Sequence, residues 1–326
     1  MSSRPVDMTT NAHVFYIVGP TASGKSEITA AVATRCDAEI VGADAFQVYR
    51  GLARLTAQPD VALRAAVPHH LIGTIDVTEE MSAAKFAELA RSAIAEIRSR
   101  DRNVIVVGGS GLYVRALTDG FSERPPGDAK LRAHLAELSL GELNLRLRAV
   151  DSKAAARIDT NNRRRVERAL EICLLGAKAP SEHLVASAVP GETGRQSGSV
   201  GDARRTTHAA AGVFVFRDRE DLYQRINLRV ERMFEEGVVE EVRMSRGLGA
   251  TAAQAIGARE IQSLLRGQTS GPECIARIQQ ATRHYAKRQL TWFRRQSNFE
   301  PLNLSHRSTA EAIEWIAQKA CLSFAR

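Results

Sequence analysis

The stretch VFYIVGPTASGKS at residues 14–26 joins a short apolar run to a glycine-containing turn that ends in lysine and serine. Residues 19–26 fit the pattern G-x-x-x-x-G-K-[ST], and a helix-compatible segment follows from Lys25 to about Arg35. A strand before this turn and a helix after it are the context in which such a turn binds phosphate. Backbone amides and the helix N-terminus then face the anion, and the lysine adds a cation. The stretch therefore predicts a diphosphate-binding loop.

The predicted diphosphate-binding residues are the eight residues of this turn. We expect the Ser26 hydroxyl on Mg²⁺, whose other ligands would be diphosphate oxygens and water. The predicted set is Gly19, Pro20, Thr21, Ala22, Ser23, Gly24, Lys25 and Ser26.

Two further apolar runs, Glu39–Ala43 and Val104–Val107, are short, rich in β-branched residues and bounded by turn residues, so they read as buried strands. Between them, apolar residues recur at helical spacing from Phe86 to Ile97. Val213–Phe216 has the pattern of another strand. Strands that alternate with amphipathic helices predict a parallel α/β sheet.

The pattern changes after about Gly120. Leucines at helical spacing from Leu131 to Leu138 and a second helical stretch from Asn161 to Leu175 predict a mainly helical insertion at 121–212, with a flexible Gly/Ser-rich segment at 190–212. The expected fold is thus a P-loop parallel-sheet core at 14–120 and 213–326, with C-terminal helices, the helical insertion, and a flexible tail at 1–13.

Composition limits the function classes. Hydrophobic residues make up 44% and charged residues 25% of the 326 residues, as in ordinary globular proteins. The net charge of +8 favours a polyanionic partner without identifying it. No secretory leader or membrane span is evident, and no cysteine pair has zinc-site or redox spacing. We therefore expect a cytoplasmic protein in which Cys36, Cys173, Cys274 and Cys321 are reduced thiols.

A phosphate loop alone does not separate a nucleotide hydrolase from another enzyme that grips a diphosphate. In nucleotide hydrolases a second apolar strand commonly ends in an Asp that helps to hold the metal. Here Val104–Val107 ends in GGSG at 108–111, which offers no acid. In the first half of the sequence the strand-terminal aspartate is Asp44, followed three residues later by Gln47.

The stretch DAFQVYRG at 44–51, after a loop spelled GPTASGKS, resembles the tRNA dimethylallyltransferases, also called isopentenyl-tRNA transferases. Further blocks follow in that family's order, and the resemblance extends from about residue 14 to 297. These blocks are His69–Ile72, Gly108–Tyr113, Arg164–Glu171, Ala255–Glu260 and Ala286–Arg294.

The resemblance implies transfer of a dimethylallyl group from dimethylallyl diphosphate to N6 of the adenosine 3′-adjacent to the anticodon, with release of diphosphate. It makes Asp44 the general base and Ser110, where the family usually has Thr, a catalytic hydroxyl. Arg225 and Arg229 match an R-x-x-x-R helix in which one arginine serves the diphosphate or the reacting end. Mg²⁺ is the implied cofactor. A carboxylate that removes the amine proton, and loop amides that stabilise the departing anion, suit this chemistry.

The implied partners are the tRNA anticodon stem-loop and dimethylallyl diphosphate, with no membrane partner, and the protein is expected to be a monomer. The segment Ile275–Gln296 supports RNA binding because it carries six basic residues and no acidic one. We expect its Trp292 and Phe293 to be core residues. The implied tRNA-binding residues are Asp44, Ala45, Phe46, Gln47, Ser110, Arg132, Arg164, Arg165, Val166, Glu167, Arg168, Gln254, Ala255, Ile256, Gly257, Ala258, Arg259, Arg283 and Lys287.

The sequence departs from the family pattern at Ala45, Gln58, Gly73 and Ala258, where Ser, Lys, Asp and Tyr are usual. Three other functions stay open. A small-molecule kinase or nucleotide hydrolase would use the same loop, and a related prenyltransferase would act on free adenine nucleotides. A non-catalytic paralogue, which the departures around Asp44 suggest, would only bind RNA.

Overall fold

The computed structural model of the chain describes residues 14–120, 127–176, 211–245 and 247–325. The chain divides into two compact units, one of residues 1–119 and 204–326, the other of residues 120–203. The predicted tail at 1–13 lies outside the described residues. So does the predicted flexible segment at 190–212, except for its last two residues, and the final one already belongs to a strand.

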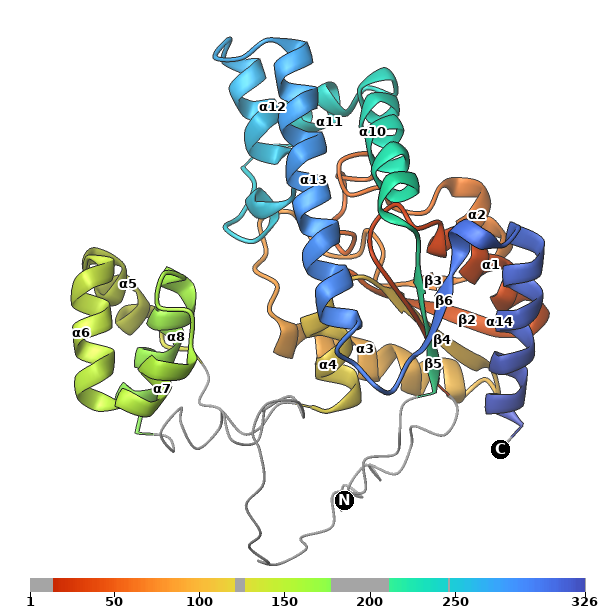
Figure 1. Cartoon of the computed structure of the whole chain (residues 1–326), viewed down its shortest axis with the longest axis horizontal. Helices are drawn as coiled ribbons and strands as arrows, with labels where there is room; N and C mark the ends of the chain where they lie inside the picture. Colours follow the sequence, from red (N-terminus) through yellow and green to blue (C-terminus); the bar gives the residue numbers. More distant parts are fainter. Residues whose placement is uncertain (1–13, 121–126, 177–210, 246, 326) are drawn as a thin grey trace, which may run out of the picture. The chain divides into compact units, whose positions relative to one another are not determined.

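The first unit is built on a six-stranded sheet in the order β3-β2-β4-β1-β5-β6, in which every pairing is parallel (Figure 1). The predicted α/β core is confirmed, although the two edge strands β3 and β6 were not predicted. The strands are β1 Val14–Val18, β2 Ala38–Ala43, β3 His69–His70, β4 Asn103–Gly108, β5 Gly212–Phe216 and β6 Glu300–Asn303.

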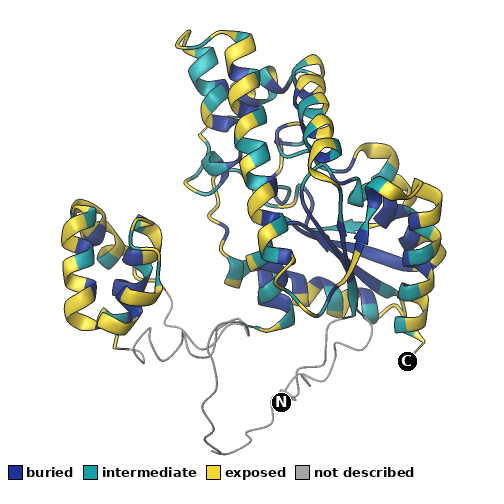
Figure 2. Ribbon diagram, in the orientation of Figure 1, coloured by how far each residue is buried: buried dark blue, intermediate teal, exposed yellow. Residues whose placement is uncertain are grey.

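Side chains alternate between the two faces of this sheet, and helices cover both faces (Figure 2). In β1, Phe15 and Ile17 belong to one core cluster, while Tyr16 and Val18 belong to the other. The first cluster is completed by α1 Lys25–Arg35 and α14 Thr309–Phe324. Burial on both faces explains why β1 is apolar throughout and why β4 is apolar after Asn103.

The second face carries α3 Ala83–Arg98 and α4 Gly111–Thr118, together with the helices that follow β5. Of these, α10 Arg219–Glu235 and α13 Gly271–Phe293 pack side by side (Figure 1). The remaining elements of the unit are the helices α2 Val61–Ala66, α11 Val238–Met244 and α12 Ala258–Leu265, and the 3₁₀ turns η1 Ala252–Gln254 and η2 Leu304–His306.

The C-terminal end of α13 is anchored in this core. Phe293 is 1% exposed, and its ring stacks on Phe214 with centroids 5.6 Å apart. Trp292 is half-buried and packs against the same cluster. The prediction that both aromatic residues are core residues is confirmed.

The second unit is helical throughout its described part, with α5 Ala129–Glu137, α6 Leu140–Val150, α7 Ser152–Arg157 and α8 Arg163–Leu174. Its small core gathers one apolar face from each helix and includes Leu135, Leu143, Leu147, Val166 and Leu170. The predicted helices at Leu131–Leu138 and Asn161–Leu175 correspond to α5 and α8, whereas α6 and α7 were not predicted.

Two cysteines correct the expectation of reduced thiols. Cys36 ends α1 and Cys321 lies in α14, and these two residues, 285 positions apart in sequence, form a disulfide with Cα atoms 5.7 Å apart. The two helices pack against each other on one face of the sheet, which no sequence spacing reveals. Cys173 and Cys274 are free thiols, as expected. Among the described helices, none is long and apolar enough to cross a membrane.

Candidate active site

The loop between β1 and α1 has the tight geometry that its sequence predicts. Gly24 adopts φ +93°, in the left-handed region that favours glycine. A Cβ at Gly19 would lie 2.2 Å from the carbonyl oxygen of Val215, so no larger residue fits between β1 and β5 there. The Gly19 amide donates to the carbonyl of Gly108 at 3.1 Å. The loop is therefore fixed to the carboxyl ends of the central strands, where open α/β sheets bind ligands.

Lys25 and Asp44 interact across this edge of the sheet. Burial lowers the pKa of Lys25 to about 8; the Asp44 carboxylate opposes the shift, and Arg229 adds to it. The Lys25 ammonium donates to the carbonyl of Pro20 at 3.1 Å. The predicted base and the predicted phosphate-binding cation therefore share one electrostatic environment.

Asp44 directly follows β2 and closes a short turn. One carboxylate oxygen, Oδ1, accepts hydrogen bonds from the amides of Phe46 at 3.0 Å and Gln47 at 3.4 Å. Ser110, which is buried, accepts from the amide of Ala45 at 3.1 Å through its hydroxyl oxygen. These contacts fix the turn from both sides and hold the Asp44 side chain in place.

Tyr285 of α13 interacts with Asp44 and Ser110. Burial raises the pKa of its phenol, the Asp44 carboxylate raises it further, and hydrogen bonds to Ser110 and Gln289 act in the opposite direction. The phenol therefore remains protonated at neutral pH beside the Asp44 turn.

One pocket of the first unit is lined by both ends of the predicted site. Thr21 of the phosphate loop and Asp44 contribute to its wall, together with Arg229, Phe46 and Tyr285. The rest of the lining is mainly apolar: Leu55, Thr56, Val230, Met233, Ala255, Ile256, Ile278 and Thr282. A ligand in this pocket would contact the loop and the carboxylate together.

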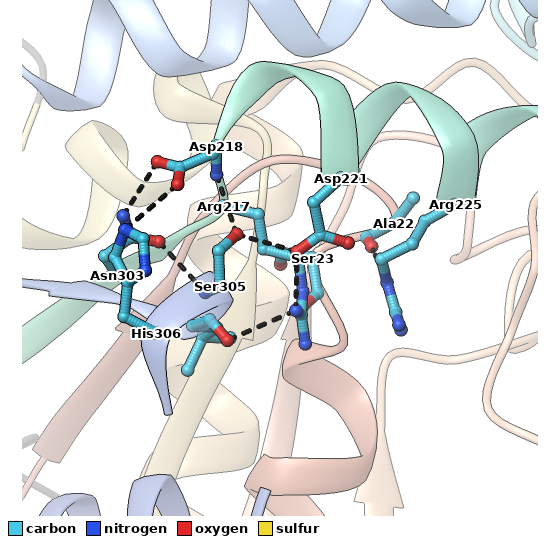
Figure 3. Close-up of polar contacts among 10 residues, drawn as sticks. Ala22, Ser23, Arg217, Asp218, Asp221, Arg225, Asn303, Ser305 and His306 are labelled. Atoms are coloured by element: carbon cyan, nitrogen blue, oxygen red, sulfur yellow. Dashed lines mark hydrogen bonds and ion pairs between the residues drawn. The ribbon is translucent and has the colours of Figure 1, made fainter. Parts of the chain in front are cut away.

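Three arginines contact three consecutive residues of the loop, and Figure 3 shows two of them, Arg217 and Arg225. Arg229 donates to the Thr21 hydroxyl at 2.5 Å, and Arg225 donates to the carbonyl of Ala22 at 3.0 Å. Arg217 donates to the carbonyl of Ser23 at 2.9 Å. Of the two arginines that the sequence left undecided, Arg229 lines the pocket and Arg225 does not.

Gln289 is a site residue that the sequence analysis missed. It is buried on α13, and its amide oxygen accepts from the Thr21 amide at 2.9 Å. Its amide nitrogen donates to the carbonyl of Gly109 at 2.8 Å, so Gln289 links the phosphate loop to the end of β4. The signal available in the sequence is its place in the block at 286–294, in which basic and aromatic residues carry the more obvious chemistry.

The family model described as IPP transferase matches residues 47–296. The chain belongs to this family. Its sequence is 44% identical over 292 residues to a tRNA dimethylallyltransferase of Geobacter metallireducens, covering 86% of this chain and 89% of that protein. It is 40% identical over 298 residues to the tRNA dimethylallyltransferase of Akkermansia muciniphila, covering 91% and 96%.

Solved structures agree with this assignment. The full-length tRNA isopentenylpyrophosphate transferase of Bacillus halodurans matches with a TM-score of 0.65 and 34% identity, covering 96% of this chain and 98% of that one. A eukaryotic dimethylallyltransferase acting on tRNA matches with a TM-score of 0.72 and 25% identity, covering 90% and 74%. The resemblance to the tRNA dimethylallyltransferases is confirmed.

In this chain, the turn that contains Gln47 is hydrogen-bonded to the segment at 56–58. The Gln47 amide nitrogen donates to the carbonyls of Thr56 at 3.2 Å and Ala57 at 2.7 Å. Gln58, where the family usually has Lys, donates to the carbonyls of Gln47 at 2.9 Å and Tyr49 at 2.7 Å. Gly73, a second departure, lies against Gln58, because a Cβ at Gly73 would be 3.3 Å from its amide oxygen. Both departures therefore belong to one local contact.

The other predicted tRNA-binding residues of the first unit fall into two groups. The first group is the segment 254–259. Ala255 and Ile256 line the pocket, and Gln254 and Gly257 flank this pair in the sequence. Ala258 is buried at the start of α12, and Arg259 is exposed. On α13, Arg283 donates to the Asn227 side chain at 2.7 Å, while Lys287 is exposed.

In the second unit, Arg132 and Arg168 share one buried carboxylate. Glu171 accepts from Arg132 at 2.8 Å and from Arg168 at 2.5 Å, and its side chain is 2% exposed. Arg164 and Arg165 are exposed at the start of α8, while Glu167 pairs with Arg163 at 2.7 Å. The Val166 side chain is fully buried in the core of the unit, so the charged side chains around it form the accessible part of this block.

The residues near the loop fit a Mg²⁺ ion whose oxygen ligands would come mainly from the bound diphosphate and from water. Among the residues that the structure describes, no group of three His, Cys, Asp or Glu side chains could hold a metal ion alone. Ser26 is half-buried at the first turn of α1, and the hydroxyl of Ser23 is buried without a hydrogen-bond partner in the described structure. A hydroxyl beside a diphosphate cradle suits an ion that keeps phosphate oxygens and water as ligands.

Proposed function

We propose that this chain transfers a dimethylallyl group from dimethylallyl diphosphate to N6 of the adenosine 3′-adjacent to the anticodon of tRNA, releasing diphosphate. The observation that carries the proposal is the single pocket lined by both Thr21 of the phosphate loop and Asp44. An amine held at Asp44 and a diphosphate held at the loop could then meet across one allylic carbon. The names of the related enzymes support the same reaction.

Asp44 acts as the general base in this proposal. An exocyclic adenine amine is a weak nucleophile, and it becomes acidic as the new N–C bond forms, so a carboxylate within hydrogen-bond reach removes the proton. Because Oδ1 is occupied by the amides of Phe46 and Gln47, the other oxygen, Oδ2, is the one assigned to the amine. Ser110 supports this role by holding the next residue of the turn.

The phosphate loop stabilises the leaving group. Breaking the C–O bond to the donor leaves negative charge on diphosphate. We assign the stabilisation of this charge to loop amides, to Lys25 and to Arg229, which holds the Thr21 hydroxyl. Bound Mg²⁺ would neutralise part of this charge, with Ser26 as its protein ligand. A diphosphate next to Lys25 also favours the protonated lysine, which burial otherwise disfavours.

The apolar part of the pocket suits the transferred group. Leu55, Val230, Met233 and Ile278 are hydrophobic, and all four line the same pocket as Thr21 and Asp44. A five-carbon branched chain gains from leaving water in such surroundings. The target base must leave the anticodon-loop stack to reach this pocket, as bases do in other enzymes that modify them.

Basic residues on both units would bind the RNA. Lys287 and Arg288 are exposed on α13, and Arg164 and Arg165 are exposed on α8. Such side chains contact phosphates and make affinity depend on salt. We propose the anticodon stem-loop as the bound region, and a monomer that acts in the cytoplasm.

The test is incubation of the protein with Mg²⁺, dimethylallyl diphosphate and either unmodified tRNA or AMP, followed by nucleoside mass spectrometry. We expect prenylated adenosine in tRNA and none from AMP. Asp44→Asn should abolish transfer and leave tRNA binding largely intact, whereas Asp101→Asn, a matched change at an exposed turn, should not affect either. Prenylated AMP with unmodified tRNA would instead establish a nucleotide prenyltransferase, and nucleoside triphosphate hydrolysis alone would establish a hydrolase.

A further inference from the structure

Arg217 lies between the end of β5 and the start of α10, beneath the phosphate loop, and its side chain is 14% exposed. Its guanidinium donates hydrogen bonds to three acceptors. Nε donates to the carbonyl of Ser23 at 2.9 Å, and Nη1 donates both to Asp221 at 2.8 Å and to the carbonyl of Leu304 at 3.2 Å (Figure 3). Arg217 therefore connects the loop to two other parts of the chain.

The partners of Arg217 are themselves held in place. Asp221 accepts a second hydrogen bond from the Ser305 hydroxyl at 2.7 Å, and the Ser305 oxygen accepts from the Asp218 amide at 2.9 Å. Asn303 and His306 continue this network on the Asp218 carboxylate, at the exposed side away from the loop (Figure 3). The C-terminal strand and the 3₁₀ turn after it thus fix the guanidinium behind the loop.

The contact with Ser23 has a direct effect on an anion-binding group. The carbonyl of Ser23 and the amide of Gly24 belong to one planar trans peptide, in which C=O and N–H point in opposite directions. Fixing the carbonyl on Arg217 therefore turns the Gly24 N–H away from Arg217. Arg225 holds the preceding peptide in the same way, through the carbonyl of Ala22 at 3.0 Å.

The backbone of Gly24 does not by itself fix the orientation of the Ser23–Gly24 peptide. It has φ +93°, and glycine explores this region and its mirror with similar ease. The guanidiniums of Arg225 and Arg217 approach it closely: a Cβ at Gly24 would lie 3.5 Å and 3.7 Å from their Nη2 atoms. The two arginines therefore restrict a peptide that would otherwise be free to turn.

We propose that Arg217 is a positioning residue for the diphosphate: it presets the Ser23–Gly24 peptide so that the Gly24 amide faces the bound anion. The inference rests on the proposed function, because it assumes that the loop binds the diphosphate of the donor. Arg217 does not contact the reacting atoms and acts through the loop alone. The alternative is that its ion pair with Asp221 only stabilises the start of α10.

The experiment compares Arg217→Gln, Arg217→Lys and Asp221→Asn with His306→Ala, a change at the exposed end of the same network. The dissociation constant of inorganic diphosphate with Mg²⁺, the KM values for dimethylallyl diphosphate and tRNA, and the melting temperature are measured for each. We expect Arg217→Gln to weaken diphosphate binding and raise the donor KM about tenfold, with an unchanged tRNA KM. Arg217→Lys, which can still donate to Ser23, should recover part of this loss, and Asp221→Asn should show a smaller loss.

A lower melting temperature with unchanged diphosphate affinity, measured where the variant is folded, would overturn the proposal, because it would leave Arg217 a purely structural role. Equal losses in Arg217→Gln and His306→Ala would overturn it too. Failure of the wild-type protein to bind diphosphate at all is a different result, since it would refute the proposed function rather than the role of Arg217.

Discussion

Replacing Gln289 with leucine tests the link between α13 and the phosphate loop most directly. The change keeps the approximate size of the side chain and removes both of its hydrogen bonds, to the Thr21 amide and the Gly109 carbonyl. A buried polar group that loses its partner costs about 1–3 kcal/mol. The Gly109 contact is buried and the Thr21 contact is only partly buried, so the expected loss in the free energy of unfolding is about 1–3 kcal/mol, mainly from Gly109.

The assay is urea denaturation, with Gln280→Leu as the matched control, because Gln280 is exposed on the same helix. The control should unfold at the wild-type midpoint, and Gln289→Leu at a clearly lower one with the same m-value. Gln289→Glu separates the two bonds: a carboxylate still accepts from Thr21 but cannot donate to Gly109, and it places negative charge beside the diphosphate. We expect this variant to raise the donor KM more than leucine does. A Gln289→Leu midpoint equal to that of the control would refute the reasoning.

Three further predictions concern the loop, the disulfide and the second unit. Burial lowers the pKa of Lys25 in the unliganded protein to about 8, and diphosphate binding needs the charged lysine, so diphosphate affinity should fall as pH rises through 8. Calorimetry from pH 7 to about 9.5 should show this fall in the wild type and not in Lys25→Ala. Cys321→Ser removes the disulfide to Cys36 and should lower the free energy of unfolding by about 2–5 kcal/mol, as measured by denaturation. Thiol titration of the wild-type protein as isolated checks that the disulfide is present, and equal stability of the wild type and the variant would contradict the prediction. Arg165→Ala should weaken tRNA binding and reduce the slope of log affinity against log salt by about one, with the donor KM unchanged, while Arg148→Ala, exposed on α6, should leave the slope as it is.

Sequence patterns predicted the elements whose signals are local. The loop at 19–26 and the central strands depend on neighbouring residues, and the structure agrees with both. By contrast, β6 has the sequence EPLN with one buried residue, so neither alternation nor an apolar run marks it. It becomes a strand because β5, about 85 residues earlier, offers an edge to pair with. Such pairing is decided by packing and leaves little local trace.

The same distinction separates the site residues that were found from those that were missed. Lys25 belongs to a motif in which spacing itself carries the chemistry, and Asp44 ends a predicted strand and lies in a block that resembles the family. Gln289 reaches the loop from 268 residues away, and Arg217 from 194 residues away. A lone glutamine in a basic helix and an arginine after a strand are common in sequences. Only packing gives Gln289 its partners at the phosphate loop and β4, and gives Arg217 its partners in the loop, α10 and η2.

The strand order of the sheet also determines when, during synthesis of the chain, each strand can pair with its neighbours. The central strand β1 pairs with β4 on one edge and with β5 on the other, and β5 begins at Gly212, about 100 residues after β4 ends. At roughly 5–20 residues per second, ribosomes would need about 5–20 s to make that stretch. Throughout this interval one side of VFYIV has no neighbour, and an unpaired apolar edge invites pairing with other polypeptides. The inserted helices thus lengthen the period in which this edge of β1 stays unpaired in a nascent molecule.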